Sequence, residues 1–483
     1  MGTVCRIIMR RSYLEAYLTV GLVGSSMVAE DSARWLIGTP PDILGAALKA
    51  VVEAYAKHEE TRYSLRSCLY EVARERSYPA KSIEVARRLI WEHGTKRNLL
   101  AKIVDRVTMG ERLPTDRRVL LELFANQAVV RGCSRLEATK FVQAARSSLG
   151  KDWMAPLEPL LGRLYALKLE GKVVEGGDEL EEISLEYGHP RWFVEYLFKI
   201  LGKAEAVRLM QASNEKPPTY FVLNRLKASE EEILEMLERD GVKFERDKRA
   251  PLLYRMVSSK ALRDVAAYKR GLIAVQDFSS VFSVVSIQPK GGMGFLDVCA
   301  APGIKTSLIA IYAQNKARIL SVDASPHRLM TYLSYTRRLG VEGTDAVLCD
   351  ATTDLPTRMS ADVVILDPPC SATGLFWREP SYRWVIKPTT VKRFAAIQKK
   401  MLGNAARHVK NNGLLVYCTC SITIEENEGL VKEFLELNPG FKLEEPPTKS
   451  GSPGLLGLEE CRRLYPHRDA CNGFFVAFLR KAG

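Results

Sequence analysis

The sequence lacks the cysteine patterns of a metal site or of a secreted, disulfide-bonded protein. Its 10 cysteines show neither paired zinc-site spacing nor a disulfide framework. Cys418 and Cys420 stand two residues apart without a nearby histidine, so we expect no metal there. These absences favour a reducing, cytoplasmic setting.

The sequence also lacks a continuous apolar run long enough to cross a membrane. Near the N-terminus, basic residues precede an apolar stretch, as in a secretion signal, but Glu15 interrupts it. We interpret residues 1–40 as an N-terminal extension that forms a tail or short helix, with Met27 as an alternative start, and we expect no membrane partner.

The length and charge of the chain set limits on its class. With 483 residues, of which 46% are hydrophobic and 26% charged, the chain can form two or three domains with cores of their own. The formal charge of +13 favours an acidic partner such as nucleic acid, although a solvated basic surface would give the same total.

Two different patterns precede residue 271. From Pro41 to about Glu170, apolar residues recur at helical spacing, which predicts an all-α domain over residues 41–175. Its Cys68, Cys133 and His93 are expected to be core or surface residues.

Residues 176–270 contain linker helices and then a strand, helix, strand, strand and helix, which predict a small α+β module. Basic and aromatic residues alternate in this module and could hold an RNA strand, although any solvated α+β face would look alike. These residues are Tyr220, Phe221, Arg225, Lys227, Arg255, Lys260, Arg263, Tyr268, Lys269 and Arg270.

Strands and helices alternate from residue 271 to 483, which predicts a parallel sheet covered on both faces. Its first strand leads into the stretch from Phe295 to Thr306, where a Pro-Gly turn precedes a helix. Such a loop presents backbone N–H groups and a helix N-terminus to a polar ligand. Each of four predicted strands carries an acid at its carboxyl end, so we expect one crevice lined by Asp297, Asp323, Asp350 and Asp367.

Two thiols are expected at the same rim. Cys370 follows Asp367-Pro-Pro after the fourth strand, and Cys420 follows the fifth. The two prolines fix the backbone beyond Asp367 and remove competing N–H donors. Thiolates are soft nucleophiles near neutral pH, so these cysteines are candidates for covalent catalysis.

These motifs resemble the Nop/Sun family of S-adenosylmethionine-dependent RNA cytosine-5 methyltransferases. The resemblance spans about residues 41 to 481 and is strongest from Gly271 onward. It implies an all-α NusB-like N-terminal domain, an RRM-like α+β module and a Rossmann-like class I methyltransferase domain. The motifs that carry it are Asp297 to Thr306, Val322 to Arg328, Asp350, Asp367 to Gly374, Thr419 to Ser421 and Pro466 to Phe475.

The resemblance also implies a role for each site residue. Cys420 is expected to add to carbon 6 of the cytosine, Asp367 to bind or protonate N3, and Cys370 to assist the final elimination. Asp323 is expected on the ribose hydroxyls and Asp350 on the adenine amino group. The remaining expected cofactor residues are Cys299, Ala300, Ala301, Pro302, Gly303, Ile304, Lys305, Arg328 and Asp367.

The chain departs from the family pattern at a few positions, none of which removes a catalytic group. Ile304 replaces a second glycine, Val222 an arginine, Cys418 a serine and Asn472 an aspartate. With Val222 in place, Asn224 and Arg225 are left to hold RNA.

Other residues leave two interpretations open. Trp377 and Trp384 could stack on RNA with Arg378 on a phosphate, or could pack in the core, and His467 is expected to be structural.

The substrate and the activity leave alternatives. The helical domain favours rRNA, with tRNA as the second possibility, and we expect a monomer. A non-catalytic RNA-binding factor in ribosome assembly would have the same fold, but it would have no physical reason to retain Cys420, Cys370 and Asp367 together.

Overall fold

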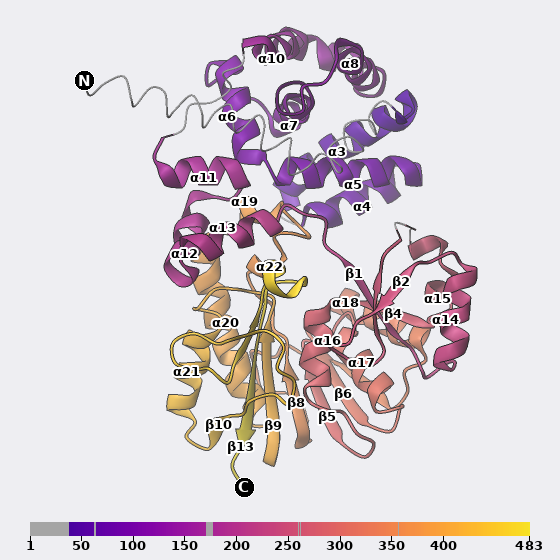
Figure 1. The fold of residues 1–483 in the computed structure, drawn as a ribbon, viewed down its shortest axis with the longest axis vertical. Helices are drawn as coiled ribbons and strands as arrows, with labels where there is room; N and C mark the ends of the chain where they lie inside the picture. Colours follow the sequence, from indigo (N-terminus) through magenta and orange to yellow (C-terminus); the bar gives the residue numbers. More distant parts are fainter. Residues whose placement is uncertain (1–37, 62–63, 171–176, 259, 261, 356) are drawn as a thin grey trace. The chain divides into compact units, whose positions relative to one another are not determined.

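A computed structural model describes residues 38–61, 64–170, 177–258, 260, 262–355 and 357–483. The predicted extension over residues 1–40 therefore lies almost entirely outside the described residues. The chain divides into two compact units, Met1–Val194 and Glu195–Gly483. Figure 1 shows the helices of the first unit and the two sheets of the second.

The first unit is helical in its described part, which confirms the prediction of an all-α domain. Helix α3 is its centre, because α4, α5, α7 and α8 all pack against it and many of its residues, such as Leu48 and Val51, are buried. Its elements are α3 (Pro41–Thr61), α4 (Leu65–Glu75), α5 (Ala80–Gly94), α6 (Arg97–Thr108), α7 (Thr115–Ala125), η1 (Asn126–Val130), α8 (Arg135–Leu149), α9 (Lys151–Met154), η2 (Ala155–Leu157), α10 (Glu158–Glu170) and α11 (Glu179–Tyr187).

Helix α11 extends this unit beyond the predicted boundary at residue 175. Asn98 on α6 donates from Nδ2 to the Ser184 carbonyl at 2.6 Å, and Lys102 pairs with Glu181 at 2.5 Å. At Gly188, which follows α11, an added Cβ would lie 1.7 Å from the Thr95 carbonyl oxygen. The sequence suggested a linker here because the acidic residues of α11 are typical of a solvated helix. In the structure, polar contacts of this kind bind α11 to α6.

The second unit begins with two helices and a small antiparallel sheet of order β2-β3-β1-β4. Strand β4 pairs with β1 from Tyr220↔Gln276 to Leu223↔Ile273, so the boundary predicted after residue 270 divides this sheet. The sequence predicted five elements for this module, and the structure adds a sixth, the short apolar strand β4. The elements are α12 (Arg191–Leu201), α13 (Lys203–Ala212), β1 (Thr219–Leu223), α14 (Glu230–Arg239), β2 (Phe244–Arg246), β3 (Leu253–Met256), η3 (Leu262–Asp264), α15 (Ala266–Lys269) and β4 (Ile273–Gln276).

Several residues proposed to hold RNA in this module are instead part of its core. Tyr220 and Phe221 are buried. The buried Asn224 amide donates at 2.7 Å to both the Gly271 and the Leu339 carbonyl oxygens, so it joins the module to helix α18 (Pro326–Leu339). The alternation of basic and aromatic residues in the sequence does not reveal that both faces of β1 are covered in the fold.

The large sheet has the order β11-β12-β13-β9-β8-β5-β6-β7, with β10 paired to β13. The five strands β7, β6, β5, β8 and β9 are parallel, and β13 is antiparallel to β9. The strands are β5 (Gly294–Val298), β6 (Arg318–Asp323), β7 (Thr344–Leu348), β8 (Ala361–Leu366), β9 (Val409–Thr419), β10 (Phe441–Leu443), β11 (Ser452–Pro453), β12 (Arg462–Leu464) and β13 (Phe474–Lys481).

Helices cover both faces of this sheet, which confirms the predicted Rossmann-like layers (Figure 1). Alternate strand residues point to opposite faces, so Phe295 packs toward α16 and α17 while Leu296 packs toward α20 and α21. The remaining elements are α16 (Phe278–Val285), α17 (Ile304–Tyr312), η4 (Thr373–Leu375), α19 (Tyr382–Val385), α20 (Pro388–Ala406), α21 (Glu428–Leu437) and α22 (Pro466–Asp469).

The strand order fixes where a site can form. After β5 the chain runs outward through β6 and β7 and then returns to β8 on the other side of β5. In open α/β sheets, ligands bind outside the carboxyl ends of the strands at such a reversal. The predicted acids and thiols follow the carboxyl ends of these strands.

Candidate active site

The loop after β5 is a tight turn closed by its own backbone. Ala300 donates its N–H to the Val322 carbonyl at 2.9 Å, and Gly303 donates to Ala300 at 2.8 Å. Gly303 has a φ of +100°, and an added Cβ would lie 3.0 Å from Tyr332. Only glycine suits this position. Helix α17 begins at Ile304, so the residue that departs from the family pattern occupies a helix start.

The buried carboxyl of Asp297 lies beneath this turn. Thr306 donates its hydroxyl to Oδ2 at 2.6 Å, whereas Oδ1 has no hydrogen-bond partner among the described residues. Burial raises the pKa of Asp297 to about 6. A donor or cation that entered the loop would satisfy this oxygen.

Asp323 at the end of β6 holds the turn to the sheet. Its Oδ2 accepts the Ala301 N–H at 3.2 Å, and its Oδ1 accepts the Ser325 N–H at 3.0 Å. The second lone pair of Oδ1 remains for a ligand. Arg328 lies 3.4 Å from Oδ2 and also donates to the Ala301 carbonyl, so its half-exposed guanidinium covers the turn.

Asp350 lies on the next strand tip and is exposed. Its Oδ1 accepts the Thr352 N–H at 2.9 Å, and the preceding Cys349 donates its N–H to the Asp323 carbonyl at 3.0 Å. The chain thus brings Asp350 beside the β6 tip, as the strand order requires.

Asp367 after β8 forms an ion pair that the sequence analysis did not foresee. Its Oδ2 accepts a short hydrogen bond from Lys305 Nζ. Lys305 is almost fully buried, whereas the Asp367 side chain is 35% exposed. Burial alone would lower the pKa of Lys305, but the facing carboxylate raises it overall, so the ammonium stays charged. Lys305, expected on the cofactor, therefore pairs with the residue expected to contact the base.

Cys370 and Cys420 are brought together from two loops, with their sulfur atoms 2.8 Å apart. Both are free thiols. The hydrogen bond with Cys420, burial and the charge of Cys420 together raise the pKa of Cys370 well above its usual value. The two thiols lie within hydrogen-bond distance, and either sulfur can be the donor.

Two glycines let these loops approach. Gly374 donates its N–H to the Cys420 carbonyl at 2.9 Å, and Gly473 donates to the Gly374 carbonyl at 2.9 Å. An added Cβ on Gly374 would lie 1.9 Å from the Gly473 oxygen. No side chain fits between the three segments.

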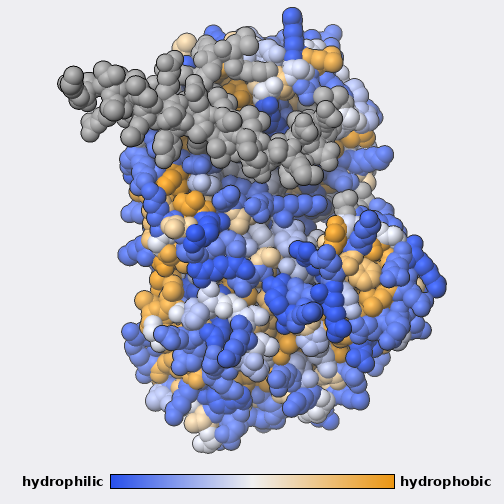
Figure 2. Space-filling view, in the orientation of Figure 1, coloured by the Kyte–Doolittle hydropathy of each residue, from blue (hydrophilic) through white to orange (hydrophobic). Residues whose placement is uncertain are grey.

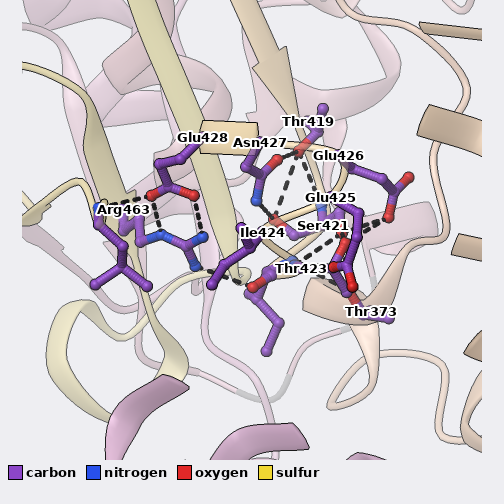
Figure 3. A network of polar contacts seen from close by, with 12 residues as sticks. Thr373, Thr419, Ser421, Thr423, Ile424, Glu425, Glu426, Asn427, Glu428 and Arg463 are labelled. Carbon is purple, nitrogen blue, oxygen red and sulfur yellow. Dashed lines mark hydrogen bonds and ion pairs between the residues drawn. The ribbon is translucent and has the colours of Figure 1, made fainter. Parts of the chain in front are cut away.

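A buried polar network binds the residues that follow the two thiols, and the sequence analysis did not predict it. Figure 3 shows the part of this network around Glu426 and Glu428. The fully buried Glu426 accepts hydrogen bonds from Ser421 at 2.6 Å and Thr423 at 2.9 Å. Beside it, Glu428 forms a buried ion pair with Arg463. The signal in the sequence was the run Glu425-Glu426-Asn427-Glu428, which reads as a solvated acidic turn although three of its four residues are fully buried.

The aromatic stretch after Cys370 is partly core. Trp377 is buried and donates Nε1 to Asn472 Oδ1 at 3.1 Å. Arg378 donates to the same oxygen at 2.7 Å and pairs with Asp277 at 2.8 Å. Arg378 is thus bound within the chain, where the sequence analysis considered a phosphate contact.

The described residues hold neither a metal cluster nor a membrane span. They contain no cluster of three or more His, Cys, Asp or Glu side chains suited to a metal ion. Within the same residues, every helix is too short or too polar to cross a lipid bilayer.

Comparison with known proteins places this site in a family. The model of the 16S rRNA methyltransferase RsmB/F domain matches residues 284–480, and the model of the ferredoxin-like domain of RsmF/B-like methyltransferases matches residues 189–254. Ribosomal RNA small subunit methyltransferase B of Yersinia pseudotuberculosis serotype O:1b (strain IP 31758) is 31% identical over 296 residues, covering 61% of this chain and 67% of its relative. The Serratia proteamaculans (strain 568) protein of the same name is 31% identical over 299 residues, with the same coverage.

Solved structures agree with this assignment. The crystal structure of PH0851 has a TM-score of 0.77 and 27% identity, covering 92% of this chain and 99% of that one. NSun6 from Pyrococcus horikoshii, solved with SFG, an S-adenosylmethionine analogue, has a TM-score of 0.57 and 25% identity, covering 61% of this chain and 98% of that one. The resemblance to the Nop/Sun family is thereby confirmed, and the chain belongs to the RsmB/F family of S-adenosylmethionine-dependent 16S rRNA methyltransferases.

Proposed function

We propose that the protein methylates carbon 5 of a cytosine in RNA, with small-subunit rRNA as the favoured substrate. The observation that carries this proposal is the pair of thiols 2.8 Å apart. One of them, Cys370, stands three residues beyond Asp367, the carboxylate that pairs with the buried Lys305. Carbon 5 of cytosine is a poor nucleophile. A sulfur that adds to carbon 6 supplies the missing electron density, which explains why two cysteines and an acid are needed together.

The cysteines divide this work. We assign the attack on carbon 6, which forms the covalent adduct, to the sulfur of Cys420. Asp367 donates a hydrogen bond or a proton to N3 as negative charge develops there, and Lys305 holds its carboxyl group in place. At the end of the reaction the proton on carbon 5 is removed with the help of Cys370, and the bond from Cys420 to carbon 6 breaks.

The loop after β5 fits S-adenosylmethionine. Asp323 Oδ1 has a free lone pair for a ribose hydroxyl, and Asp350 is open to the adenine amino group. Asp297 Oδ1 has no hydrogen-bond partner among the described residues and can accept from a donor of the ligand. The turn from Cys299 to Lys305 would hold the methionine end. When bound, S-adenosylmethionine supplies an activated methyl group on a sulfonium.

RNA is proposed to contact an open pocket of about 340 Å³ between the small sheet and α22. Two of its carboxylates form ion pairs, Asp247 with Arg249 and Glu245 with Arg255, and the third, Asp469, accepts the Tyr465 N–H at 2.8 Å. Arg246 and Lys248 are exposed and have no hydrogen-bond or ion-pair partner among the described residues. Free cations beside satisfied acids favour a phosphate of the RNA backbone.

Transfer of a labelled methyl group tests the proposed function. The protein is incubated with methyl-labelled S-adenosylmethionine and unmodified small-subunit rRNA, or with tRNA in a parallel reaction, and the digested nucleosides are separated. Labelled 5-methylcytidine from rRNA is expected. Label found only in tRNA would show that tRNA, and not rRNA, is the substrate. Label on another nucleoside would refute the cytosine chemistry. No label in either RNA would favour a non-catalytic assembly factor.

The pocket has its own test. Arg246→Glu with Lys248→Glu should weaken RNA binding and reduce the slope of log Kd against log salt by about 1 to 2, because each lost phosphate contact contributes roughly 0.7 to 0.9. The control is Lys400→Glu with Lys432→Glu, which reverses two exposed charges on α20 and α21. Equal losses in both double variants would show that only net charge matters.

A further inference from the structure

The residues on both sides of each reactive cysteine are bound to one buried turn. Before Cys420, Thr419 donates to Asn427 Oδ1 at 2.6 Å. After it, the Ser421 carbonyl accepts from Asn427 Nδ2 at 2.9 Å, and the Ser421 hydroxyl donates to Glu426 at 2.6 Å. The loop that carries Cys420 is therefore fixed on both sides.

The Cys370 loop is fixed by the same turn. Ser371 donates its N–H to Glu426 Oε1 at 2.8 Å, and its hydroxyl makes a short bond to Oε2. Gln398 of α20 donates to the Pro369 carbonyl at 2.9 Å and to Glu426 Oε1 at 2.9 Å. Ser371 and Ser421, which follow the two cysteines, thus bind the same carboxylate.

This carboxylate has a full set of donors and no cationic partner among the described residues. Two obligate donors, the Ser371 N–H and the Gln398 amide, bind Oε1. Three hydroxyls bind Oε2, and they belong to Ser371, Ser421 and Thr423. These five hydrogen bonds replace the bonds to water that are lost on burial.

We propose that Glu426 is a positioning residue that fixes the distance between the sulfur atoms of Cys370 and Cys420. It touches neither substrate nor sulfur, and it acts through Ser371 and Ser421, the residues that follow the two cysteines. The two loops come from different strands, β8 and β9, so their separation depends on a group that binds both. Displacements of about 1 Å in such a pair lower the rate by on the order of 100-fold.

The donor pattern allows shape and charge to be separated. In Glu426→Gln, the amide oxygen can remain on the obligate donors at Oε1, while the new NH₂ group faces only hydroxyls, which can rotate to accept. In Glu426→Ala the connection between the loops is lost. If position is what matters, glutamine should preserve what alanine destroys.

The first measurement is independent of the proposed methyl transfer. Diamide takes two electrons and two protons from a pair of thiols, so that a disulfide forms and diamide is reduced to the hydrazine. Peptide mapping at successive times gives the rate at which the Cys370–Cys420 disulfide forms. In Glu426→Ala the disulfide should form at least about 10-fold more slowly than in wild type, because the two sulfur atoms are no longer held close together. In Glu426→Gln, which keeps them close, the rate should stay within about 3-fold of wild type.

The control is Glu428→Gln, which disturbs an equally buried carboxylate two residues away. Glu428 binds Arg463 and the Leu455 N–H, and it reaches the Cys420 loop only through the bond from Arg463 to the Ile422 carbonyl. This variant should lower the melting temperature without changing the disulfide rate. If Glu426→Ala does not fold, Ser421→Ala removes one arm of the connection and should slow the bond by about 3-fold or more. An unchanged rate in the folded alanine variant, or equal slowing by Glu428→Gln, would overturn the proposal.

The second measurement is kinetic and rests on the proposed function. Glu426→Ala should lower kcat by about 100-fold, with KM for RNA and for S-adenosylmethionine within about 3-fold, and Glu426→Gln should recover most of kcat. A glutamine variant as slow as alanine would show that charge, and not position, is required. Absence of methyl transfer by the wild type would refute the proposed function while leaving the disulfide result valid.

Discussion

The two sides of the crevice rim are built differently. The cysteine rim, residues 367–376 and 419–427, is held by fully buried polar groups such as Ser371, Ser421 and Glu426. The edge rim, residues 326–350, is open: Leu348 is 54% exposed, Met330 is 66% exposed, and β7 has no strand beyond it in the sheet. Buried hydrogen bonds fix the cysteine rim, whereas the edge rim is accessible to solvent.

This difference separates chemistry from binding. Covalent attack requires atoms to be placed within a fraction of an ångström, which buried hydrogen bonds can enforce. A cofactor that must enter and leave needs an accessible edge. Substitutions in the cysteine rim should therefore reduce kcat, and substitutions in the edge rim should mainly raise the KM for S-adenosylmethionine.

The largest effect is expected at the ion pair of the cysteine rim. Lys305→Met removes the buried ammonium that holds Asp367, so kcat/KM should fall by on the order of 1,000-fold, as when a charge-stabilising donor is lost from an active site. The control is Lys410→Met, which breaks the exposed pair with Asp362 at the other end of β8 and should change stability by less than about 1 kcal/mol. Similar kinetic losses in both variants would contradict the account.

Between the two rims, Asp297 should make stability depend on pH. Burial raises its pKa to about 6, above the value near 4 of an unfolded chain. The folded state then binds more protons between about pH 4 and 6, so this contribution is complete below pH 4 and is lost as the pH rises through 6, by about 3 kcal/mol. In urea denaturation, Asp297→Asn should gain stability relative to wild type across this window. A constant difference would show that Asp297 titrates normally.

The close approach in the cysteine rim predicts a clash. Gly374→Ala should destabilise the protein by about 2 kcal/mol, because the added Cβ would overlap the Gly473 oxygen. Gly403→Ala in helix α20 makes the same chemical change where no atom lies within 4 Å and should stabilise by about 0.5 to 1 kcal/mol. Chemical denaturation gives both values. The same sign for both substitutions would show that the close approach is not rigid.

The smallest effect is expected at the edge rim. Asp350→Ala should weaken S-adenosylmethionine binding by about 5-fold, the value of one exposed hydrogen bond, with little change in kcat. Asp345→Ala, an exposed acid within β7, is the control and should leave binding unchanged. Isothermal titration calorimetry measures both dissociation constants. A loss of kcat without weaker binding would place Asp350 on the chemical side of the rim.

The sequence was sufficient for features set by local pattern. The apolar runs that end in Asp323, Asp350 and Asp367 placed those acids at strand tips. The spacing around Cys370 and Cys420 then placed two thiols at neighbouring tips, and these are in contact in the structure. Such patterns can be recognised because strand direction and side-chain alternation follow from a few consecutive residues.

Features that depend on long-range contacts were not accessible. The pair between Lys305 and Asp367 joins residues 62 apart, and Glu426 reaches Ser371 across 55. A run of acids looks solvated until the donors that surround it are known, and Tyr220 looks like an exposed aromatic until both faces of β1 are covered. Burial of polar residues is a property of the assembled fold.

The most direct test of the central claim compares the two cysteines in the same assay. Each single alanine variant is incubated with S-adenosylmethionine and substrate RNA, then denatured and resolved by electrophoresis. Cys370→Ala should accumulate a covalent protein–RNA adduct, because Cys420 can attack but elimination is impaired, whereas Cys420→Ala should form none. An adduct with Cys420→Ala and not with Cys370→Ala would exchange the two roles, and adducts with neither variant would contradict covalent catalysis at this rim.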